Sequence, residues 1–294
     1  MYKNKIILIC SLFCALCFAQ KKEVQVVLLA GQSNMQGHGN YEALEVSVQQ
    51  RIEKIANRVL LSTSNNPNVA ARPLSYFVST NQPEKYKFTK HFGPEIMIGL
   101  TLAEKFPNQE FLLIKTAVGG TSLYGAWNPN WSQEKANLAE RGAERKAMKL
   151  YEAHLTHVQN DLKRLKAEGK PYKILGMVWM QGEGDTNKEI TAKSYKENLT
   201  ALIKGCRTSL EMPQMPFVIG EVNPLSRKYK EGPDLVRKAM EEVANQDKNT
   251  GIVKTSRDSS WSDYPKHSDN LHYNTEGQKR LGTAMAKELI LLLK

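Results

Sequence analysis

Residues 24–37 read V-Q-V-V-L-L-A-G-Q-S-N-M-Q-G and join an apolar run to a short polar segment. The run at 24–30 has the length and continuous hydrophobicity of a strand buried on both faces. Gly31 then allows a sharp turn, which would place Ser33 at the start of a turn or helix with its backbone N–H free to bind an anion. Ser33 is therefore a candidate nucleophile if a base lies beside it, although a turn or helix-capping serine gives the same pattern.

The rest of the chain alternates strands with helices. Four further apolar runs predict strands, at 110–115, 173–180, 216–220 and 251–254, and five segments have helical patterns, at 94–106, 143–168, 191–210, 234–245 and 275–293. This alternation predicts an α/β fold, a three-layer α/β/α sandwich around a mainly parallel five-stranded sheet. We expect Thr275 to cap the last helix.

Two long segments do not fit this alternation. Residues 38–90 carry a possible helix at 43–57 followed by a polar, proline-containing stretch, and residues 121–141 contain Trp127 and Trp131. We interpret both segments as excursions over the rim of a site, because loops commonly carry function on a rigid scaffold.

A histidine near the end of the chain has a carboxylate three residues before it. Residues 268–277 read S-D-N-L-H-Y-N-T-E-G. Asp269 and His272 would share one face of a helical turn, so that Asp269 accepts a hydrogen bond from one imidazole nitrogen while the other faces Ser33. Such a pair also arises by chance on protein surfaces. His154 and His157 have the same spacing but no third ligand in view, so we expect no metal site.

Two glycine-containing segments follow predicted strands and supply hydrogen-bond donors. They read K-T-A-V-G-G-T-S-L at 115–123 and V-W-M-Q-G-E-G-D at 178–185. Gly119 and Gly120 allow backbone N–H groups to face a crevice, and the amide of Gln181 can donate to an oxyanion. Glu183 is a second carboxylate in the same place. Because ligands of open α/β sheets bind beyond the carboxyl ends of the strands, we expect these segments to meet Ser33 there.

The motifs G-Q-S-N-M, A-x-G-G-T, W-x-Q-G-E-x-D and D-x-x-H, in this order, resemble those of the SGNH hydrolases. Within that superfamily they are most similar to the acetylxylan esterases of carbohydrate esterase family six and to the sialate O-acetylesterases. The resemblance runs from Val24 to the closing helix. It implies a flavodoxin-like fold and a serine esterase mechanism that needs no metal and no organic cofactor.

The same resemblance implies a role for each motif. Ser33 would be the nucleophile, His272 the base and Asp269 the acid that orients it, while Glu183 is a carboxylate that assists or replaces Asp269; the sequence leaves this choice open. The implied oxyanion donors are the N–H of Ser33, Gly120 or Gly119, and Gln181, which stands where the wider superfamily has asparagine. We expect the substrate to be bound by Gln32, Asn34, Trp127 and His267.

The implied activity is a carbohydrate O-acetylesterase that releases acetate from an acetylated polysaccharide of the acetylxylan type. A sialate O-acetylesterase is one alternative. A non-catalytic glycan-binding relative is another, in which Trp127, Trp131 and Trp261 would stack on sugars; the presence of a serine, a histidine and an acid in the right motifs favours the enzyme. A lipid esterase or thioesterase would need an apolar rim, whereas the segments around Ser33 and Gly120 are polar and aromatic.

The first nineteen residues have the pattern of a signal peptide. Lys3 and Lys5 precede an apolar run at 6–18, and Cys17 and Ala19 are small residues before a cleavage position. The run is shorter than the ~20 apolar residues of a membrane span. We therefore expect cleavage after Ala19, no stable membrane insertion, a secreted or periplasmic protein and a single esterase domain at 20–294. An uncleaved N-terminal anchor is the alternative.

Charge and cysteine content exclude other classes. The chain has a net charge of +11, but its basic residues are spread over helical segments without a dense basic run interleaved with aromatics, so we expect no nucleic acid partner. After removal of the leader only Cys206 remains, which excludes an intramolecular disulfide.

Overall fold

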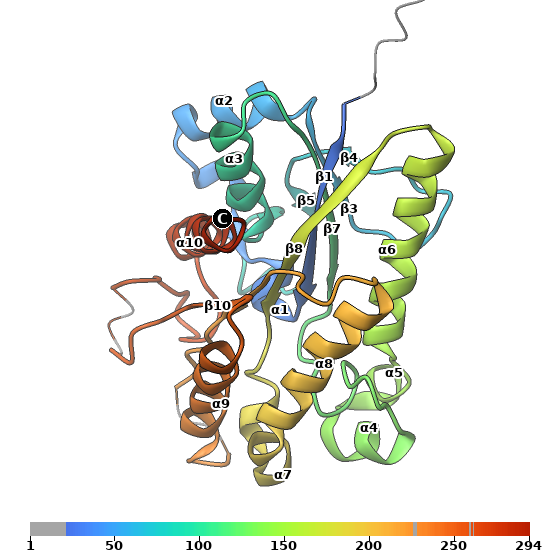
Figure 1. Ribbon diagram of the computed structural model, residues 1–294. Coiled ribbons are helices and arrows are strands. Elements are labelled where there is room, and N and C mark those ends of the chain that lie inside the picture. The colour runs from blue at the N-terminus through green and yellow to red at the C-terminus, as the bar shows by residue number, and fades with distance from the viewer. Residues whose placement is uncertain (1–21, 226–227, 259, 261) are drawn as a thin grey trace, which may run out of the picture.

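The computed structural model describes residues 22–225, 228–258, 260 and 262–294; the expected signal peptide lies outside them. At the centre of the fold, β1 (Val24–Gly31) lies between β7 (Glu110–Ala117) and β8 (Tyr172–Met180) (Figure 1). The sheet continues past β8 with β9 (Phe217–Gly220) and β10 (Thr250–Val253), and past β7 with β3 (Val59–Ser62) and β4 (Arg72–Pro73). All neighbouring pairs are parallel except β3–β4.

The five expected strands are confirmed, and their order in the sheet is the flavodoxin-like one. Numbered along the chain, β1, β7, β8, β9 and β10 are arranged 2-1-3-4-5. The expected number of strands was too low, because β3 and β4 extend the sheet beyond β7. β3 lies within the segment 38–90 and contains only three apolar residues, fewer than a recognisable apolar run requires.

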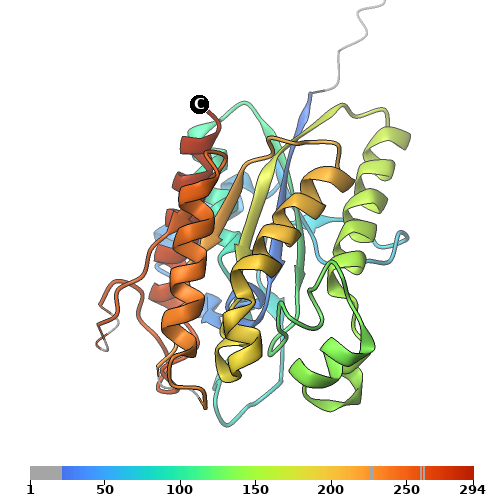
Figure 2. The ribbon, with the colours of Figure 1, turned by 60° about the horizontal axis from the view of Figure 1, so that its bottom comes forward.

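Helices cover both faces of the sheet and complete the three layers. On one face α6 (Leu150–Ala167), α8 (Tyr195–Ser209) and α9 (Gly232–Gln246) lie side by side (Figure 2). On the other face α3 (Glu95–Lys105) packs against α10 (Thr275–Leu292). β1 is buried along its whole length because both of its faces are covered. No helix in the described part of the chain is long and apolar enough to span a membrane.

Three details of the expected helices differ. The helix expected at 143–168 is divided into α5 (Gly142–Lys146) and α6, and the one at 191–210 into α7 (Glu189–Lys193) and α8. The cap of α10 is Asn274, whose side chain accepts a 3.1 Å hydrogen bond from the backbone N–H of Gly277. Thr275 does not cap the helix, because its hydroxyl accepts instead from the backbone N–H of Asn40, at 3.0 Å.

The two excursions contain further short elements. The first holds α2 (Val46–Ile55) and a small antiparallel sheet in the order β2 (Gly39–Asn40), β6 (Lys90–Phe92) and β5 (Phe77–Val78), and the second holds α4 (Gln133–Ala139). A 3-10 turn, η1 (Tyr41–Ala43), follows β2, and a second, η2 (Asp185–Asn187), follows β8.

The three central strands end together. Gly31 at the end of β1 is in register with Ala117 of β7 and Met180 of β8. A Cβ atom at Gly31 would lie 2.1 Å from the carbonyl oxygen of Met180, so only glycine lets the two strands approach this closely as the chain turns. The segments that follow these strands are therefore brought to one edge of the sheet, where the order of the strands reverses.

Candidate active site

Ser33 lies directly beyond the end of β1. It begins the short helix α1 (Ser33–Gln36), which the structure ties to β8 through a 3.0 Å hydrogen bond from the N–H of Gln32 to the carbonyl of Met180. No acceptor in the described part of the chain takes the backbone N–H of Ser33. Ser33 lines a cavity, and Gln32 rather than Ser33 occupies the N-cap position of α1.

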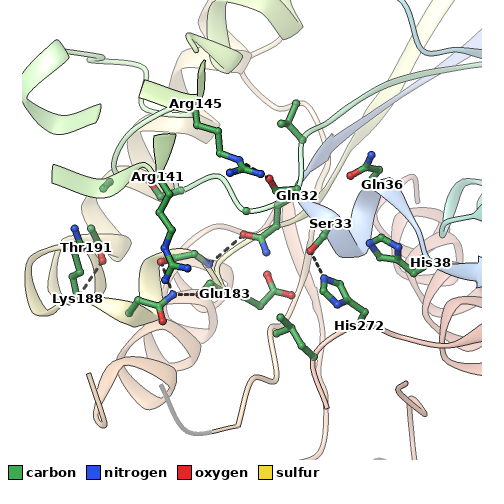
Figure 3. A pocket seen from close by; sticks show the side chains of 18 of the residues that line it. Gln32, Ser33, Gln36, His38, Arg141, Arg145, Glu183, Lys188, Thr191 and His272 are labelled. Atoms are coloured by element: carbon green, nitrogen blue, oxygen red, sulfur yellow. Dashed lines mark hydrogen bonds between the residues drawn. The ribbon is translucent and has the colours of Figure 1, made fainter. Parts of the chain in front are cut away.

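His272 and Asp269 approach Ser33 from the other end of the chain. The Nε2 atom of His272 lies 3.0 Å from Ser33 Oγ (Figure 3). Its Nδ1 atom lies 2.6 Å from Asp269 Oδ2. The other carboxylate oxygen accepts the backbone N–H groups of Leu271 and His272, at 2.9 and 3.0 Å. The pair lies on a turn in which Asn270 has a left-handed φ of 54°, not on a helical turn as we expected.

A lysine that the sequence did not single out completes the environment of Asp269. Lys85 Nζ is 2.5 Å from Asp269 Oδ2 and 3.2 Å from His272 Nδ1. Burial on its own raises the pKa of Asp269, but the hydrogen bonds from His272, Lys85 and the backbone outweigh it and hold the pKa well below its usual range. Asp269 is thus the ionised partner of His272.

His38 contacts the ring of His272, and His267 contacts its backbone. The ring of His38 stacks on Tyr86, with centroids 4.7 Å apart, and meets the ring of His272 edge-on at 4.6 Å. Burial, followed by the nearby His272, His91, Lys85 and His267, lowers the pKa of His38 to about 2, so this imidazole is neutral. His267 donates its backbone N–H to the carbonyl of His272 and does not line the cavity, contrary to the expected substrate contact.

The two glutamines have different surroundings from those expected. Gln181 is fully buried, and its Nε2 donates to Asp185 Oδ2 at 2.7 Å and to the carbonyl of Thr121 at 3.1 Å, with Gln32 Oε1 at 3.3 Å. Both of its N–H groups therefore have protein acceptors, and the expected contact with an oxyanion was wrong. Gln32 lines the cavity instead. Its oxygen accepts from Gly184 N and Gln181 Nε2, which turns its NH₂ group toward Ser33 and Glu183 (Figure 3).

Both glycines of the second motif line the cavity. A Cβ atom at Gly119 would lie 3.5 Å from Ser33 Cβ, so Gly119 directly flanks the serine. Gly120 has φ of 74°, a conformation that favours glycine, and the guanidinium of Arg145 lies over it. Arg145 Nε also donates to the carbonyl of Gly119, at 3.0 Å. The glycine turn is thus held in place beside Ser33 by a cation.

Glu183 and Asn34 connect the serine segment to the other two parts of the site. Glu183 lines the cavity, and its Oε1 accepts a 2.6 Å hydrogen bond from Asn34 Nδ2. Its Oε2 is buried, and no partner for it lies in the described residues. Asn34 is also buried and accepts the backbone N–H of Tyr273, so it holds segments together and does not reach the cavity as expected. Since His272 Nδ1 engages Asp269, the structure separates Glu183 from the orienting position.

Asp185 organises the loop that follows β7. Its carboxylate accepts the backbone N–H groups of Leu123 and Tyr124 and the amide of Gln181, at 2.7–2.9 Å. Complete burial raises its pKa to about 7 in spite of these hydrogen bonds. Asp185, the final aspartate of the W-x-Q-G-E-x-D motif, therefore holds this loop and Gln181 in place.

The cavity has a volume of about 790 Å³ and a positively charged side. Its lining includes the cations Arg141, Arg145, Lys188 and Lys228, and Glu183 is the only acid among its described lining residues. In the described part of the chain no carboxylate forms an ion pair with Arg141, Arg145 or Lys228. These charges are available to an anionic ligand.

Neither Trp127 nor Trp131 lines this cavity. Trp127 is fully buried and packs edge-to-face against Trp179, with ring centroids 5.1 Å apart, so it belongs to the core. Trp131 does not line the cavity, and Lys149 lies over its ring. Trp261 lies outside the described residues. A large aromatic ring in a loop looks the same in the sequence whether it packs inward or stacks on a sugar.

His154 and His157 have buried polar partners. His154 Nδ1 lies 3.0 Å from the hydroxyl of Thr116, and His157 Nε2 lies 2.8 Å from that of Ser62. Among the residues that the structure describes, no three His, Cys, Asp or Glu side chains form a group that could hold a metal ion. The pair joins α6 to β7 and β3.

Comparisons with known proteins show which family and which folds this chain resembles. A family model described as "Carbohydrate esterase, sialic acid-specific acetylesterase" matches residues 23–291. A probable carbohydrate esterase of Arabidopsis thaliana is 24% identical over 273 residues, covering 90% of this chain and 89% of the relative.

Solved structures share the fold. That of the Arabidopsis protein superposes with a TM-score of 0.65 at 21% identity, covering 92% of this chain and 98% of the other. The structure of NanS gives 0.62 at 16% identity, covering 92% and 98%. A carbohydrate acetylesterase from Xanthomonas citri gives 0.54 at 18% identity, covering 89% of this chain and 55% of the other.

Proposed function

Because the chain belongs to the carbohydrate esterase family of sialic acid-specific acetylesterases, we propose that it hydrolyses O-acetyl esters of a carbohydrate with Ser33 as the nucleophile. His272 is the general base and Asp269 the acid that orients it. The observation that carries the proposal is the continuous chain of contacts from Ser33 Oγ through His272 to Asp269, at 3.0 and 2.6 Å. A glycan-binding module would have no use for this arrangement.

The reaction takes place in two steps on these residues. Ser33 Oγ attacks the acetyl carbonyl carbon while its proton passes to His272 Nε2. The carbon–oxygen bond to the sugar breaks, the sugar oxygen takes the proton from His272, and the acetyl group remains on Ser33. Water then attacks the acetyl-serine and gives a proton to His272, and acetate leaves as this proton returns to Ser33 Oγ.

The developing oxyanion has three donors in this proposal: the N–H of Ser33, an N–H of the Gly119–Gly120 turn, and the amide of Gln32. Gln32 takes the place that we expected for Gln181, because its NH₂ group is the one that faces the cavity. A preorganised donor of this kind contributes about 2.7–4 kcal/mol to the stabilisation of a transition state.

The charge of the cavity supports an acidic sugar as the substrate. Arg141, Arg145 and Lys228 have no carboxylate partner among the described residues, and a carboxylate ligand suits an arginine geometrically. We therefore propose an O-acetylated sialic acid, the alternative that the sequence left open, as the substrate in preference to the neutral acetylxylan. Trp127, which we expected to bind the substrate, is buried in the core and does not line the cavity.

Acetate release from a panel of acetylated glycans tests both parts of the proposal. We expect release from O-acetylated sialic acid with a higher kcat/KM than from acetylxylan, and none from either with Ser33→Ala. Arg141→Gln together with Lys228→Gln should raise KM for the acidic sugar at least tenfold and leave p-nitrophenyl acetate turnover within about threefold, because neither side chain holds the glycine turn. Equal effects on acidic and neutral substrates would contradict the acidic-sugar assignment, and full activity of Ser33→Ala would contradict the mechanism.

We also propose that the protein is exported, on the basis of the residue pattern at 1–19 alone. N-terminal sequencing of the protein isolated from outside the cytoplasm should begin at Gln20. Recovery of a cytoplasmic protein that retains Met1 would contradict export.

A further inference from the structure

Lys85 reaches the Asp269–His272 pair from the loop between β5 and β6. Its ammonium group shares Asp269 Oδ2 with the imidazole, at 2.5 Å from Lys85 Nζ and 2.6 Å from His272 Nδ1. It also lies over the ring of Tyr86, 4.9 Å from the ring centroid, and Tyr86 in turn stacks on His38. Its side chain is 30% exposed, so water only partly screens its charge. The lysine is therefore held at the rear of the catalytic pair, away from the substrate side.

We propose that Lys85 is a positioning residue for this reaction: it fixes the Asp269 carboxylate and keeps His272 in its neutral, proton-accepting form to lower pH. The inference rests on the proposed function of Ser33, His272 and Asp269. Lys85 has no contact with the reacting atoms, because it does not line the cavity. It acts on the imidazole through its charge and through the carboxylate that the two groups share.

Lys85 and His272 share one carboxylate oxygen of Asp269. A carboxylate beside a histidine favours the charged imidazolium, whereas a cation beside it disfavours that form. Here Lys85 Nζ is 3.2 Å from His272 Nδ1 and bound to the same carboxylate oxygen. The cation therefore offsets part of the attraction that would otherwise hold a proton on His272. At acidic pH more of the enzyme then retains a free base.

The other groups that face His272 do not supply this charge. His38 meets the ring edge-on and is neutral, because burial lowers its pKa to about 2. His267 contacts the backbone of His272, and burial also lowers its pKa. Glu183 lies on the cavity side, where its negative charge would favour a protonated imidazole. Substitution of Lys85 alone should therefore reveal how its positive charge affects the protonation of His272.

The test compares pH profiles of kcat/KM for p-nitrophenyl acetate. In Lys85→Met the acidic limb should move to higher pH by about one unit, which means about a tenfold loss of activity below the limb. Lys85→Arg, which keeps the charge, should hold the limb within about 0.3 units of the wild type. Lys87→Met is the matched control, since it removes an exposed positive charge from the same loop, and it should leave the profile unchanged.

A KM measurement separates this role from a structural one. Asn81 and Gln82 of the same loop line the cavity, so a distorted loop would raise KM, whereas the loss of the Lys85 charge alone should change kcat at low pH and leave KM within about twofold. A uniform loss of kcat at every pH, or the same shift in Lys85→Arg as in Lys85→Met, would overturn the proposal.

An NMR titration of the imidazole makes the result independent of turnover. The His272 ring signals, identified by their absence in His272→Gln, should titrate at higher pH in Lys85→Met than in the wild type. This experiment remains decisive if the esterase proposal fails, because it needs no substrate. Identical titration midpoints in the two proteins would reject the role of Lys85 whatever the activity assays show.

Discussion

The side-chain amide of Gln32 has one orientation because both neighbours of its oxygen are donors. The N–H of Gly184 and the amide of Gln181 both point at Gln32 Oε1, at 3.2 and 3.3 Å, so a reversed amide would place donors against donors. Gln181 in turn is fixed by Asp185. A row of buried hydrogen bonds thus ends in an NH₂ group at the cavity, which is a preorganised donor.

Gln32→Leu should lower kcat for ester hydrolysis by about 10²–10³-fold with little change in KM, since one oxyanion donor is removed. Gln32→Glu provides the control, because a carboxylate still accepts from Gly184 and Gln181 but cannot donate when ionised. Gln32→Glu should lose at least as much activity as Gln32→Leu. Its unfolding temperature should be nearer to that of the wild type than the unfolding temperature of Gln32→Leu. If Gln32→Glu keeps kcat within tenfold of the wild type, Gln32 is not a donor to the transition state.

Asp269 and Glu183 are the two acids between which the sequence could not decide. Asp269→Asn should lower kcat by about 10³–10⁴-fold, because the imidazole loses the acceptor that fixes its tautomer. Glu183→Gln should stay within tenfold of the wild type, since its oxygen can still accept from Asn34 and it makes no contact with His272 among the described hydrogen bonds. Steady-state kinetics on both variants measures the difference. The reverse order of losses would assign the orienting role to Glu183.

At the scale of elements, the loop after β7 depends on one buried carboxylate. Asp185 lies on η2 and binds the backbone of residues 123 and 124, which follow the glycine turn. Desolvation raises its pKa to about 7, compared with about 3.9 in an unfolded chain. The folded protein therefore binds this proton more tightly than the unfolded chain does.

The raised pKa of Asp185 predicts a pH-dependent stability. The contribution of Asp185 to the free energy of unfolding is fully present below about pH 4 and is lost as the pH rises through about 7. Between these two pH values the free energy falls by up to about 1.4 kcal/mol per pH unit. Asp185→Asn removes this titration. The free energy of unfolding of the wild type should thus fall relative to that of Asp185→Asn between pH 5 and pH 7 in urea titrations. Parallel curves for the two proteins would show that Asp185 has an ordinary pKa.

Element prediction from the sequence succeeded where the signal was local. Long apolar runs such as 24–30 and 173–180 identified the central strands, and the motifs that follow them lie at the carboxyl edge as expected. The three apolar residues of β3 were too few to indicate a strand. The cap of α10 lies one residue before the expected Thr275, because the Thr275 hydroxyl accepts a hydrogen bond from the backbone N–H of Asn40. Contacts between distant segments decide such details, and they leave no local pattern.

At the scale of the whole molecule, the site is assembled from segments far apart in the chain. Lys85 and His272 are 187 residues apart, and nothing near Lys85 in the sequence indicates that it faces Asp269. Trp127 and Asn34 lie in the expected motifs, yet both are buried and serve the core or the hydrogen-bond network. The residue types and their order predicted the chemistry, whereas the direction of each side chain required the fold.

Asn34 is the point at which three of these segments are joined. Its NH₂ group donates to Glu183 Oε1 beyond β8, at 2.6 Å, and to the carbonyl of Leu271, at 3.2 Å. Its oxygen accepts the N–H of Tyr273, at 3.1 Å, next to His272. The residue after the proposed nucleophile thus fixes the segment that carries the base. Its loss should therefore affect stability and turnover together.

Asn34→Asp tests this connection because it keeps the acceptor for Tyr273 and replaces the donor by a second carboxylate oxygen beside Glu183. Two carboxylates so close cannot both ionise, so the pair must hold a proton, and its pKa in the folded protein is raised above that in the unfolded chain. Stability is then retained at low pH and lost as the pH rises. We expect Asn34→Asp to lose about 3–5 kcal/mol of unfolding free energy at pH 8 and much less at pH 5.

The double variant Asn34→Asp, Glu183→Gln reverses the direction of the same hydrogen bond, since the new glutamine amide can donate to the new carboxylate. It should recover most of the loss at pH 8, leaving about 1 kcal/mol for the unpaired carbonyl of Leu271. Urea unfolding of the wild type, both single variants and the double variant at pH 5 and pH 8 gives the coupling free energy. A loss that is equal at both pH values, or that persists in the double variant, would show that Asn34 stabilises the site through its other contacts and not through Glu183.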